Sequence, residues 1–431
     1  MRRFSLFSFG KPSPFFLMSF FSLACGGDEK PIDSGDEPGY PPITETPTYH
    51  EDIARIIIDN CLSCHQEGQI GPFPLDSYET VRIFGESVAD SVKNRRMPPY
   101  LADNSGDCNT YKDATWLSDY EIALIEAWVD GGMPEGDPAN APELPPESAP
   151  FEATHSVTFD VYEADFATAA DDYRCFIVDP GLTQDSFLTA FEVLPSNPGI
   201  AHHMILYKPV DNAALADAYT LEAQDPGQGY SCFGGAEVDS SMVAPWAPGK
   251  AIWSYPEGTG ILVEAGRPLI MQMHYSNASD DPLDSTTVNM DFSTEVDNEL
   301  YARFFVNSDI EIPPGQSDHS ETYSAKIGNY FGTSQPLTIM GLVPHMHKLG
   351  KSEYGKVVRA DGSEECLMDV PRWDFNWQLM YMFEDPVVMQ PDDKIHMECV
   401  FDSSDESSTV YWGDGTNDEM CLFGVFAIVG D

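Results

Sequence analysis

The stretch Leu269-Ile270-Met271-Gln272-Met273-His274 predicts a β-strand, and strands of this kind decide the fold of most of the chain. On a strand, alternate side chains such as Gln272 and His274 project from one face. Two further stretches, Ser156–Val161 and Lys394–Val400, have the same character, and clusters of Pro, Gly, Asn and Asp separate such segments. From residue 153 onward we therefore expect an all-β region of about 280 residues, enough chain for two sandwiches.

Residues 48–136 have helical spacing instead. A capping-box pattern, Thr48-Tyr49-His50-Glu51, opens the first expected helix, and Ser77 to Lys93 is the second. A second capping box, Ser118-Asp119-Tyr120-Glu121, opens a third helix that ends at Gly131-Gly132. The sequence thus predicts a small all-α domain ahead of the β region, with the proline-rich residues 137–152 as a linker between them.

The first 47 residues have the composition of a targeting segment followed by a tether. A basic start precedes the apolar run Phe15–Ala24, which is too short for a permanent membrane helix, so residues 1–24 are interpreted as a signal peptide. Leu23-Ala24-Cys25-Gly26 resembles a bacterial lipobox, although Ser22 stands where lipoproteins usually have Leu. We expect a periplasmic or surface lipoprotein attached to the membrane through lipid at Cys25, with ordinary signal cleavage as the alternative. Residues 25–47, rich in Pro, Gly and acidic residues, are the expected flexible tether.

The charge of the chain excludes one class of partner. Among 431 residues, 71 are acidic and 22 are basic, which gives a formal net charge of -49. Nucleic-acid binding depends on Lys and Arg that neutralise phosphates, so we expect no nucleic-acid partner. A heavily solvated acidic surface is the simpler interpretation of this charge, and steering of cationic partners is the alternative.

One pentapeptide in the helical region points to a cofactor. Cys61-Leu62-Ser63-Cys64-His65 has the C-x-x-C-H spacing by which c-type haem is attached, with two thioethers from the cysteines and one axial nitrogen from His65. A zinc or disulfide cysteine pair beside an incidental histidine is the alternative. The stretch around Met97-Pro98-Pro99 resembles the corresponding loop of class I cytochromes c. Met97 is therefore the expected second axial ligand, with Met133 as the other candidate.

Five of the ten histidines fall in three clusters in the β region. His345 and His347 are two apart, so they share a strand face and can bind one metal. The adjacent pair His202-His203 points to opposite faces of a regular strand and needs a bend to converge. His274 forms the third cluster. Imidazole nitrogen and methionine sulfur are ligands that suit copper. Surface or core roles suffice for the isolated histidines, which are His50, His155, His319 and His396.

Several motifs in this region, in order, resemble the copper type II, ascorbate-dependent monooxygenases, over about residues 155 to 431. The motifs are Ala201-His202-His203-Met204-Ile205-Leu206, Gln272-Met273-His274-Tyr275, Ile312-Pro313-Pro314-Gly315, His345-Met346-His347-Lys348-Leu349-Gly350, Cys399-Val400-Phe401 and Asp418-Glu419-Met420-Cys421. The resemblance implies two jelly-roll halves, residues 153–296 and 297–431, with one copper each.

The ligand sets follow from that resemblance. It implies that His202, His203 and His274 hold an electron-transfer copper, and that His345, His347 and Met420 hold the catalytic, oxygen-binding copper. The thioether of Met420 is a soft donor that favours Cu(I).

The resemblance also implies disulfides. Three of the nine cysteines are assigned to lipid and haem, and the even remainder permits disulfides in an oxidising compartment. The pairs Cys175–Cys232 and Cys399–Cys421 are implied by the resemblance, and Cys108 and Cys366 have no assigned partner.

The chain departs from the peptide-amidating members at the residues that hold a peptide carboxylate. Val343 and Gly424 occupy the corresponding Arg and Tyr positions, and Leu422 replaces a nearby polar residue. We therefore expect a less polar substrate than a glycine-extended peptide.

The sequence as a whole predicts an exported monooxygenase with two coppers and one c-type haem. It would hydroxylate a C–H bond of a small organic molecule with dioxygen. The haem would receive electrons from an external donor and pass them to the copper sites. The alternative is a non-enzymatic electron-transfer or copper-handling lipoprotein that has kept the ligands.

Overall fold

The structure is a computed structural model, and it describes residues 40–67, 71–143, 150–167, 171–248, 252–277, 279–413 and 417–430. The expected signal peptide and the cysteine expected to carry lipid, Cys25, lie outside these residues. Among the described residues, none of the helices combines the length and apolar character needed to cross a membrane.

Helices make up the first part of the described chain. They are η1 (Tyr49–Ile53), α1 (Ala54–Asn60), α2 (Tyr78–Lys93), α3 (Asp119–Asp130) and η2 (Pro138–Asn140). The predicted capping box at Ser118 opens α3, and α2 covers the predicted helix, opened by a capping box at Ser77 that was not predicted. The capping box predicted at Thr48 is wrong, because the first turn is a π-helix and the Thr48 side chain bonds to Glu51 rather than to the helix backbone. Ile53, Val81 and Trp128 are fully buried in the core that these helices share.

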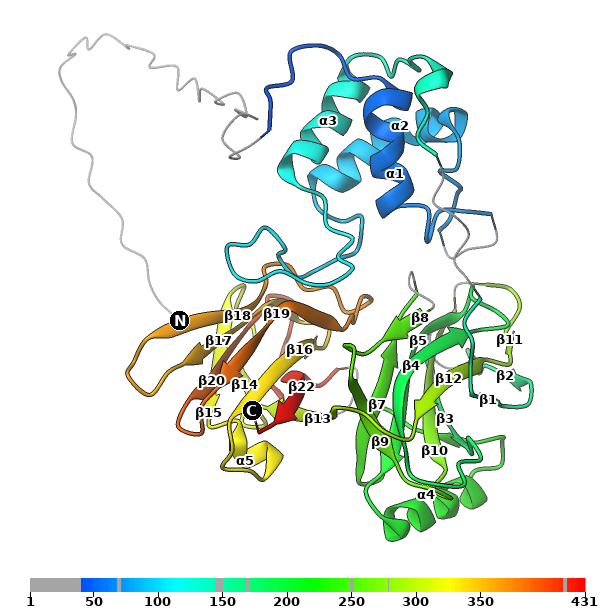
Figure 1. Cartoon of the computed structure of the whole chain (residues 1–431), viewed down its shortest axis with the longest axis vertical. Helices are drawn as coiled ribbons and strands as arrows, with labels where there is room; N and C mark the ends of the chain where they lie inside the picture. Colours follow the sequence, from blue (N-terminus) through cyan, green and yellow to red (C-terminus); the bar gives the residue numbers. More distant parts are fainter. Residues whose placement is uncertain are drawn as a thin grey trace, which may run out of the picture. The chain divides into compact units, whose positions relative to one another are not determined.

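From residue 155 onward the chain is sandwich-like and mostly β, with few helices, as predicted (Figure 1). The first-half strands are β1 (His155–Thr158), β2 (Tyr162–Glu163), β3 (Asp171–Val178), β4 (Ser186–Leu194), β5 (Ala201–Pro209), β6 (Tyr230–Ser231), β7 (Ser240–Trp246), β8 (Ile252–Ser254), β9 (Thr259–Val263), β10 (Leu269–Ser276), β11 (Leu283–Asp284) and β12 (Thr287–Ser293), with helix α4 (Asn212–Gln224). One sheet has the order β6-β3-β10-β5-β7, and β1-β12-β4-β9 runs in the other. Both sheets contribute to one core, in which Phe191 of β4 and Met204 of β5 are fully buried.

The second half repeats this plan. Its elements are β13 (Asn298–Val306), β14 (Glu311–Ile312), β15 (His319–Ala325), α5 (Gly328–Phe331), β16 (Leu337–Met346), β17 (Gly350–Val358), β18 (Glu364–Val370), β19 (Tyr381–Met389), β20 (Lys394–Phe401), β21 (Val410–Tyr411) and β22 (Cys421–Val429). The order β13-β22-β16-β19 forms one layer and β15-β20-β17-β18 the other. The core between them includes the fully buried Phe401 and Phe423.

The two halves are joined through their sheets. Strands β9 and β13 pair in parallel, Asn298 with Thr259 and Glu299 with Gly260, so one layer of each half belongs to a single nine-stranded sheet. Met340 and Phe426 of the second half are buried in the core cluster of the first. Strand β16, which carries the second histidine pair, belongs to this continuous sheet, whereas β5 and β10, which carry the other histidines, lie in the five-stranded sheet.

Candidate metal centres

The first histidine cluster lies on two neighbouring strands of the five-stranded sheet. Strand β10 pairs His274 with His203 of β5, and the next pair joins Tyr275 to Ala201. His202 is therefore an extra residue, a β-bulge of the kind that re-aims side chains. The bulge supplies the bend that His202 and His203 need in order to converge.

The three imidazoles of this cluster meet at their Nδ1 atoms. Nδ1 of His203 lies 3.1 Å from Nδ1 of His274 and 3.4 Å from Nδ1 of His202. His274 Nε2 lies 2.9 Å from a carboxylate oxygen of Asp171, so this nitrogen carries the proton and leaves the Nδ1 lone pair free. The same hydrogen bond holds the pKa of Asp171 below its usual value.

This geometry fits a metal ion. Imidazole nitrogens bind first-row metals at about 2.0–2.1 Å, so nitrogens that share one ion lie roughly 3–4 Å apart. Burial lowers the pKa of His202 to about 4 and holds that of His203 well below its usual value, so these two imidazoles are neutral and able to coordinate at neutral pH. Among the described residues, His202, His203 and His274 form the one such group of His, Cys, Asp and Glu side chains.

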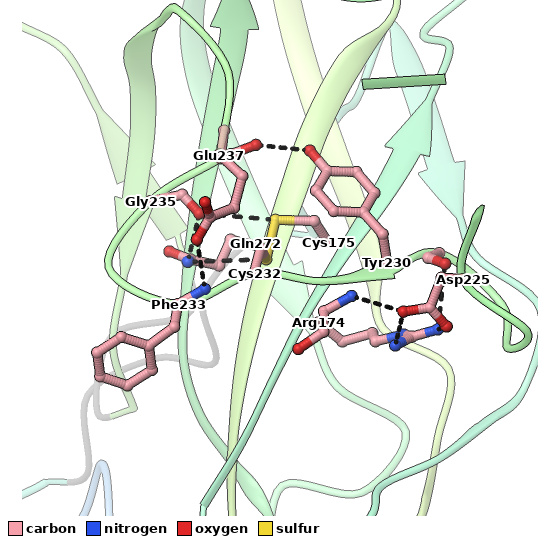
Figure 2. The surroundings of a disulfide bond; sticks show 12 residues. Arg174, Cys175, Asp225, Tyr230, Cys232, Phe233, Gly235, Glu237 and Gln272 are labelled. Atoms are coloured by element: carbon pink, nitrogen blue, oxygen red, sulfur yellow. Dashed lines mark hydrogen bonds and ion pairs between the residues drawn. A yellow bond between two sulfur atoms is a disulfide. The ribbon is translucent and has the colours of Figure 1, made fainter. Parts of the chain in front are cut away.

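Aromatic side chains and a disulfide-closed loop surround this cluster. The ring of Tyr173 stacks on His274 with centroids 4.1 Å apart, and Phe233 lies edge-on to Tyr173 at 4.6 Å. Figure 2 shows the loop that carries Phe233, closed by Cys175–Cys232. Gln272, which shares a strand face with His274, donates to the carbonyl of Gly235 at 2.9 Å and so supports this loop.

The second cluster lies at the end of β16. Nδ1 of His345 lies 2.8 Å from Oε1 of Gln378, and Nδ1 of His347 lies 3.0 Å from the carbonyl oxygen of Asp418. Each acceptor fixes the proton on Nδ1 and leaves Nε2 as the nitrogen that can bind a metal. Burial, followed by the neighbouring His347, lowers the pKa of His345 to about 3, so that it too is neutral.

Met420, the residue directly before β22, lies at the same end of the sheet. The register pairs Met346 with Cys421, so the next residues outward, His347 and Met420, leave the two paired strands together. Met420 is 4% exposed, and the Cys399–Cys421 disulfide fixes the residue that follows it.

A buried carboxylate that the sequence analysis did not single out ties these ligands together. Glu419 is 1% exposed and accepts from three backbone N–H groups: that of His347 at 2.9 Å, that of Leu349 at 2.6 Å and that of Met420 at 3.3 Å. Burial raises its pKa to about 7. The signal available in the sequence is its position directly before the expected methionine ligand.

The C-x-x-C-H motif lies at the end of α1. Cys61 and Cys64 are unpaired and partly buried, and burial raises the pKa of the Cys61 thiol to about 12. His65 Nδ1 lies 2.9 Å from the carbonyl oxygen of Phe73, which fixes the proton there and leaves Nε2 to coordinate. Two free thiols and one oriented imidazole fit the attachment of a c-type haem better than a disulfide.

The two methionines considered as second axial ligands lie in different surroundings. Met97 is 37% exposed in the connection after α2. Met133 packs against the helical core, close to Gly85 of α2. This packing gives Met133 a structural role and leaves Met97 as the more available thioether.

Comparison with known proteins covers both β halves. Residues 157–282 match the N-terminal domain of the copper type II ascorbate-dependent monooxygenases, and residues 300–426 match the C-terminal domain. From residue 157 to 426, the chain belongs to this monooxygenase family. The matches contain all six candidate copper ligands.

Named relatives come from several animals. Peptidyl-glycine alpha-amidating monooxygenase A of Xenopus laevis is 27% identical over 59% of this chain and 26% of its own length. Putative DBH-like monooxygenase protein 2 of Homo sapiens is 24% identical over 63% of this chain and 56% of its own. Dopamine beta-hydroxylase of Canis lupus familiaris is 23% identical over 51% and 39%. The chain thus spans about a quarter to just over half the length of these relatives.

Three disulfides occur in the described part of the chain. Cys175–Cys232 and Cys399–Cys421 confirm the pairs that the family resemblance implied. The third, Cys108–Cys366, was not predicted. Its partners are 258 residues apart, and only the three-dimensional fold brings them together.

Proposed function

We propose that this chain is a copper-dependent monooxygenase that hydroxylates a C–H bond of a small organic substrate with dioxygen. His202, His203 and His274 hold the electron-transfer copper, and His345, His347 and Met420 hold the copper at which substrate is oxidised. A c-type haem on Cys61 and Cys64, with His65 and Met97 as axial ligands, supplies the electrons. The main support is the convergence of the three Nδ1 atoms within 3.4 Å, on a half that matches the family.

The two ligand sets favour different tasks when copper is bound, because copper supplies one-electron chemistry with dioxygen. The first set is all imidazole and is braced by Asp171 at 2.9 Å, which suits a centre that changes charge without rearranging. The second set pairs imidazoles with the thioether of Met420, a soft ligand that favours Cu(I). Gln378 and the carbonyl of Asp418 hold the protons of its two histidines away from the metal side.

The side chains beside the second set support a substrate without a carboxylate. Val343 shares the strand face of His345 and pairs with Gly424, where a Cβ atom would lie 3.2 Å from Cβ of Val343. Leu422 pairs with His345. These residues offer no cation or hydroxyl to a carboxylate, so we propose a neutral or weakly polar substrate.

The disulfides support export, because such bonds persist in oxidising compartments. We propose a periplasmic or surface lipoprotein attached through Cys25, whose haem is reduced by an external donor.

The experiment uses the full-length purified protein. Copper and haem are quantified, and oxygen uptake is then followed over a panel of small substrates, with a chemical reductant of the haem supplied in excess because each hydroxylation consumes two electrons and the haem holds one. We expect two coppers and one haem per chain, continued oxidation of the haem only when copper, oxygen and substrate are all present, and one hydroxylated product for each oxygen molecule and each two electrons consumed. Cys61→Ser/Cys64→Ser should lose the haem and the haem-driven turnover but keep both coppers.

The outcomes separate the parts of the proposal. Two coppers without substrate-coupled oxygen uptake would favour the copper-handling or electron-transfer alternative. Turnover with ascorbate that is unaffected by loss of the haem would overturn the proposed electron supply while leaving the monooxygenase assignment in place.

A further inference from the structure

The connection between α2 and α3, residues 94–118, extends beyond the helical core and packs on the second β half. We refer to it as the docking segment. Its residues Tyr100, Leu101 and Tyr111 are at most 8% exposed and belong to the core cluster of that half, not to the helical core. The rings of Tyr100 and Tyr111 lie edge-on to Tyr381 of β19, with centroids 5.0 and 5.4 Å apart.

Covalent and backbone bonds hold the docking segment to both β18 and β19. On β18, Cys108 forms a disulfide with Cys366, and the N–H of Asp103 donates to the carbonyl of Asp369 at 2.8 Å. Further bonds reach β19: Leu101 N–H donates to the Tyr381 hydroxyl at 3.1 Å, and Lys112 N–H donates to the carbonyl of Met382 at 2.8 Å. The docking segment therefore fixes the end of one strand and the start of the next.

Residues 371–380 connect those two strands, and this connection, the site loop, contacts the second metal centre. Trp373 Nε1 donates to the carbonyl of His347 at 3.0 Å, and its ring lies 6.5 Å from that of His345. Gln378 accepts the Nδ1 proton of His345 at 2.8 Å. Gly350 permits this close packing, because a Cβ there would lie 2.6 Å from Trp373.

The end of α2 also touches the site loop directly. Arg372 donates to the carbonyl of Asn94 at 2.9 Å, one residue before the pair Arg95-Arg96. The docking segment thus holds the site loop in two ways. It contacts the loop directly through the bond from Arg372 to Asn94, and it holds β18 and β19, the two strands that flank the loop.

We propose that the docking segment is a positioning element for the second metal centre. By fixing the site loop, it keeps Gln378 where it orients the imidazole of His345, and Trp373 where it holds the backbone of His347. The ligands of the first centre lie on β5 and β10, which pair with each other and not with β18 or β19, and Asp374 of the site loop acts on His202 through its charge. The inference rests on the proposed function only where it takes the second centre to bind copper.

The test combines two perturbations of the docking segment's contacts with measurements that do not depend on turnover. Arg372→Gln removes the direct bond, and Cys108→Ser/Cys366→Ser removes the disulfide. In metal-free protein, amide hydrogen exchange of residues 371–380 should rise about tenfold in either variant, while exchange of β5 and β10 stays unchanged. Asp217→Asn, on an exposed position of α4, is the matched control.

Copper spectroscopy adds a second measurement at each centre. In a His203→Ala background, which isolates the second centre, the Cu(II) hyperfine signal should shift in both docking variants, and copper affinity should fall about tenfold. In a His345→Ala background, the signal of the first centre should not change. Gln378→Leu, which leaves the docking segment intact, should reproduce the shift at the second centre, whereas Gln378→Glu should restore an acceptor and most of the wild-type signal.

Unchanged exchange in residues 371–380 in both docking variants would overturn the proposal, as would equal changes at the two centres. Failure of the wild-type second centre to bind copper would refute the proposed function instead. The exchange measurement on metal-free protein would still decide the positioning role.

Discussion

The two candidate copper centres differ in what holds their ligands. The first takes His202 and His203 from β5 and His274 from β10, two strands that pair within one sheet. The second takes its ligands from the ends of β16 and β22 and orients them through Gln378, Glu419 and Trp373. A centre built on paired strands inherits the rigidity of the sheet, whereas one built at strand ends depends on the segments that brace it.

This difference has a consequence for how far a disturbance reaches. The supports of the first centre, Asp171 and Tyr173, lie on β3, the strand next to β10. The second centre is supported by Trp373 and Gln378, which lie in the loop between β18 and β19, and the docking segment contacts both the loop and these strands. The second centre should therefore respond to changes in distant parts of the chain, and the first should not.

The largest expected effect comes from removing a ligand of the first centre. His203→Ala takes away the nitrogen that lies within 3.4 Å of both other Nδ1 atoms. Copper content should fall from two to one per chain, and product formation should fall by about 100-fold or more. Spectroscopy of the remaining copper should match the second centre of the wild type. His155→Ala, an isolated histidine on β1, should change neither quantity. Loss of both coppers from His203→Ala would contradict the separate support of the two centres.

The disulfides beside the two centres give the next effect. The chain-entropy relation assigns about 3 kcal/mol to Cys399–Cys421, with a separation of 22 residues, and about 4 kcal/mol to Cys175–Cys232, with a separation of 57. Denaturant unfolding of the two double-serine variants should show losses of this order. Only the Cys399→Ser/Cys421→Ser variant should also weaken copper binding, at the second centre, because Cys421 directly follows Met420. Weaker binding at the first centre in the Cys175→Ser/Cys232→Ser variant would break the contrast.

The sequence pointed to the three histidines of the first centre but did not show how their side chains converge. Residue spacing alone left His202-His203 on opposite faces of a strand, and the order of family motifs was needed to bring them together. The bulge that makes them converge depends on how β5 pairs with β10, and pairing between distant strands is not written in either strand alone. The strand character of Leu269–His274 and Lys394–Val400, by contrast, is local, and both are confirmed.

The supports of the second centre were harder to foresee. Trp373, Gln378 and Glu419 act through hydrogen bonds to residues distant in the sequence, and no residue pattern near them predicts those bonds. Cys108 and Cys366 could be counted as a spare pair, but a bond over 258 residues requires the docking segment to pack on β18 first. The helices were easier, since the capping box at Ser118 is a local signal, whereas Thr48 formed a different local bond.

A smaller effect is expected from Glu419→Gln, which tests how strand ends are held together at the second centre. The amide can offer only one oxygen to the three N–H groups that the carboxylate now satisfies. The free energy of unfolding should fall by about 2 kcal/mol, because a buried donor is left without a partner. Copper affinity at the second centre should fall while that of the first is retained. Glu257→Gln, at an exposed position, is the control; a Glu419 variant with wild-type affinity at the second centre would remove Glu419 from its support.

The smallest expected effect tests whether the ligands of the first centre are unaffected by changes elsewhere in their sheet. Arg174 of β3 binds Asp225 through two hydrogen bonds, at 2.6 and 3.0 Å, and these lower the pKa of Asp225 to about 2. A carboxyl with a lowered folded-state pKa stabilises the fold above its unfolded value near 4 and loses that contribution as the pH falls through about 2. Asp225→Asn should therefore cost about 1 kcal/mol at pH 7 and flatten the acid side of the stability profile between pH 4 and 2, measured by denaturant unfolding at each pH. Asp217→Asn should do neither. Arg174 is next to Tyr173 on the strand beside His274. A loss of copper affinity at the first centre in Asp225→Asn at pH 7 would therefore show that the sheet transmits strain to these ligands. The contrast between the two centres would then be one of degree.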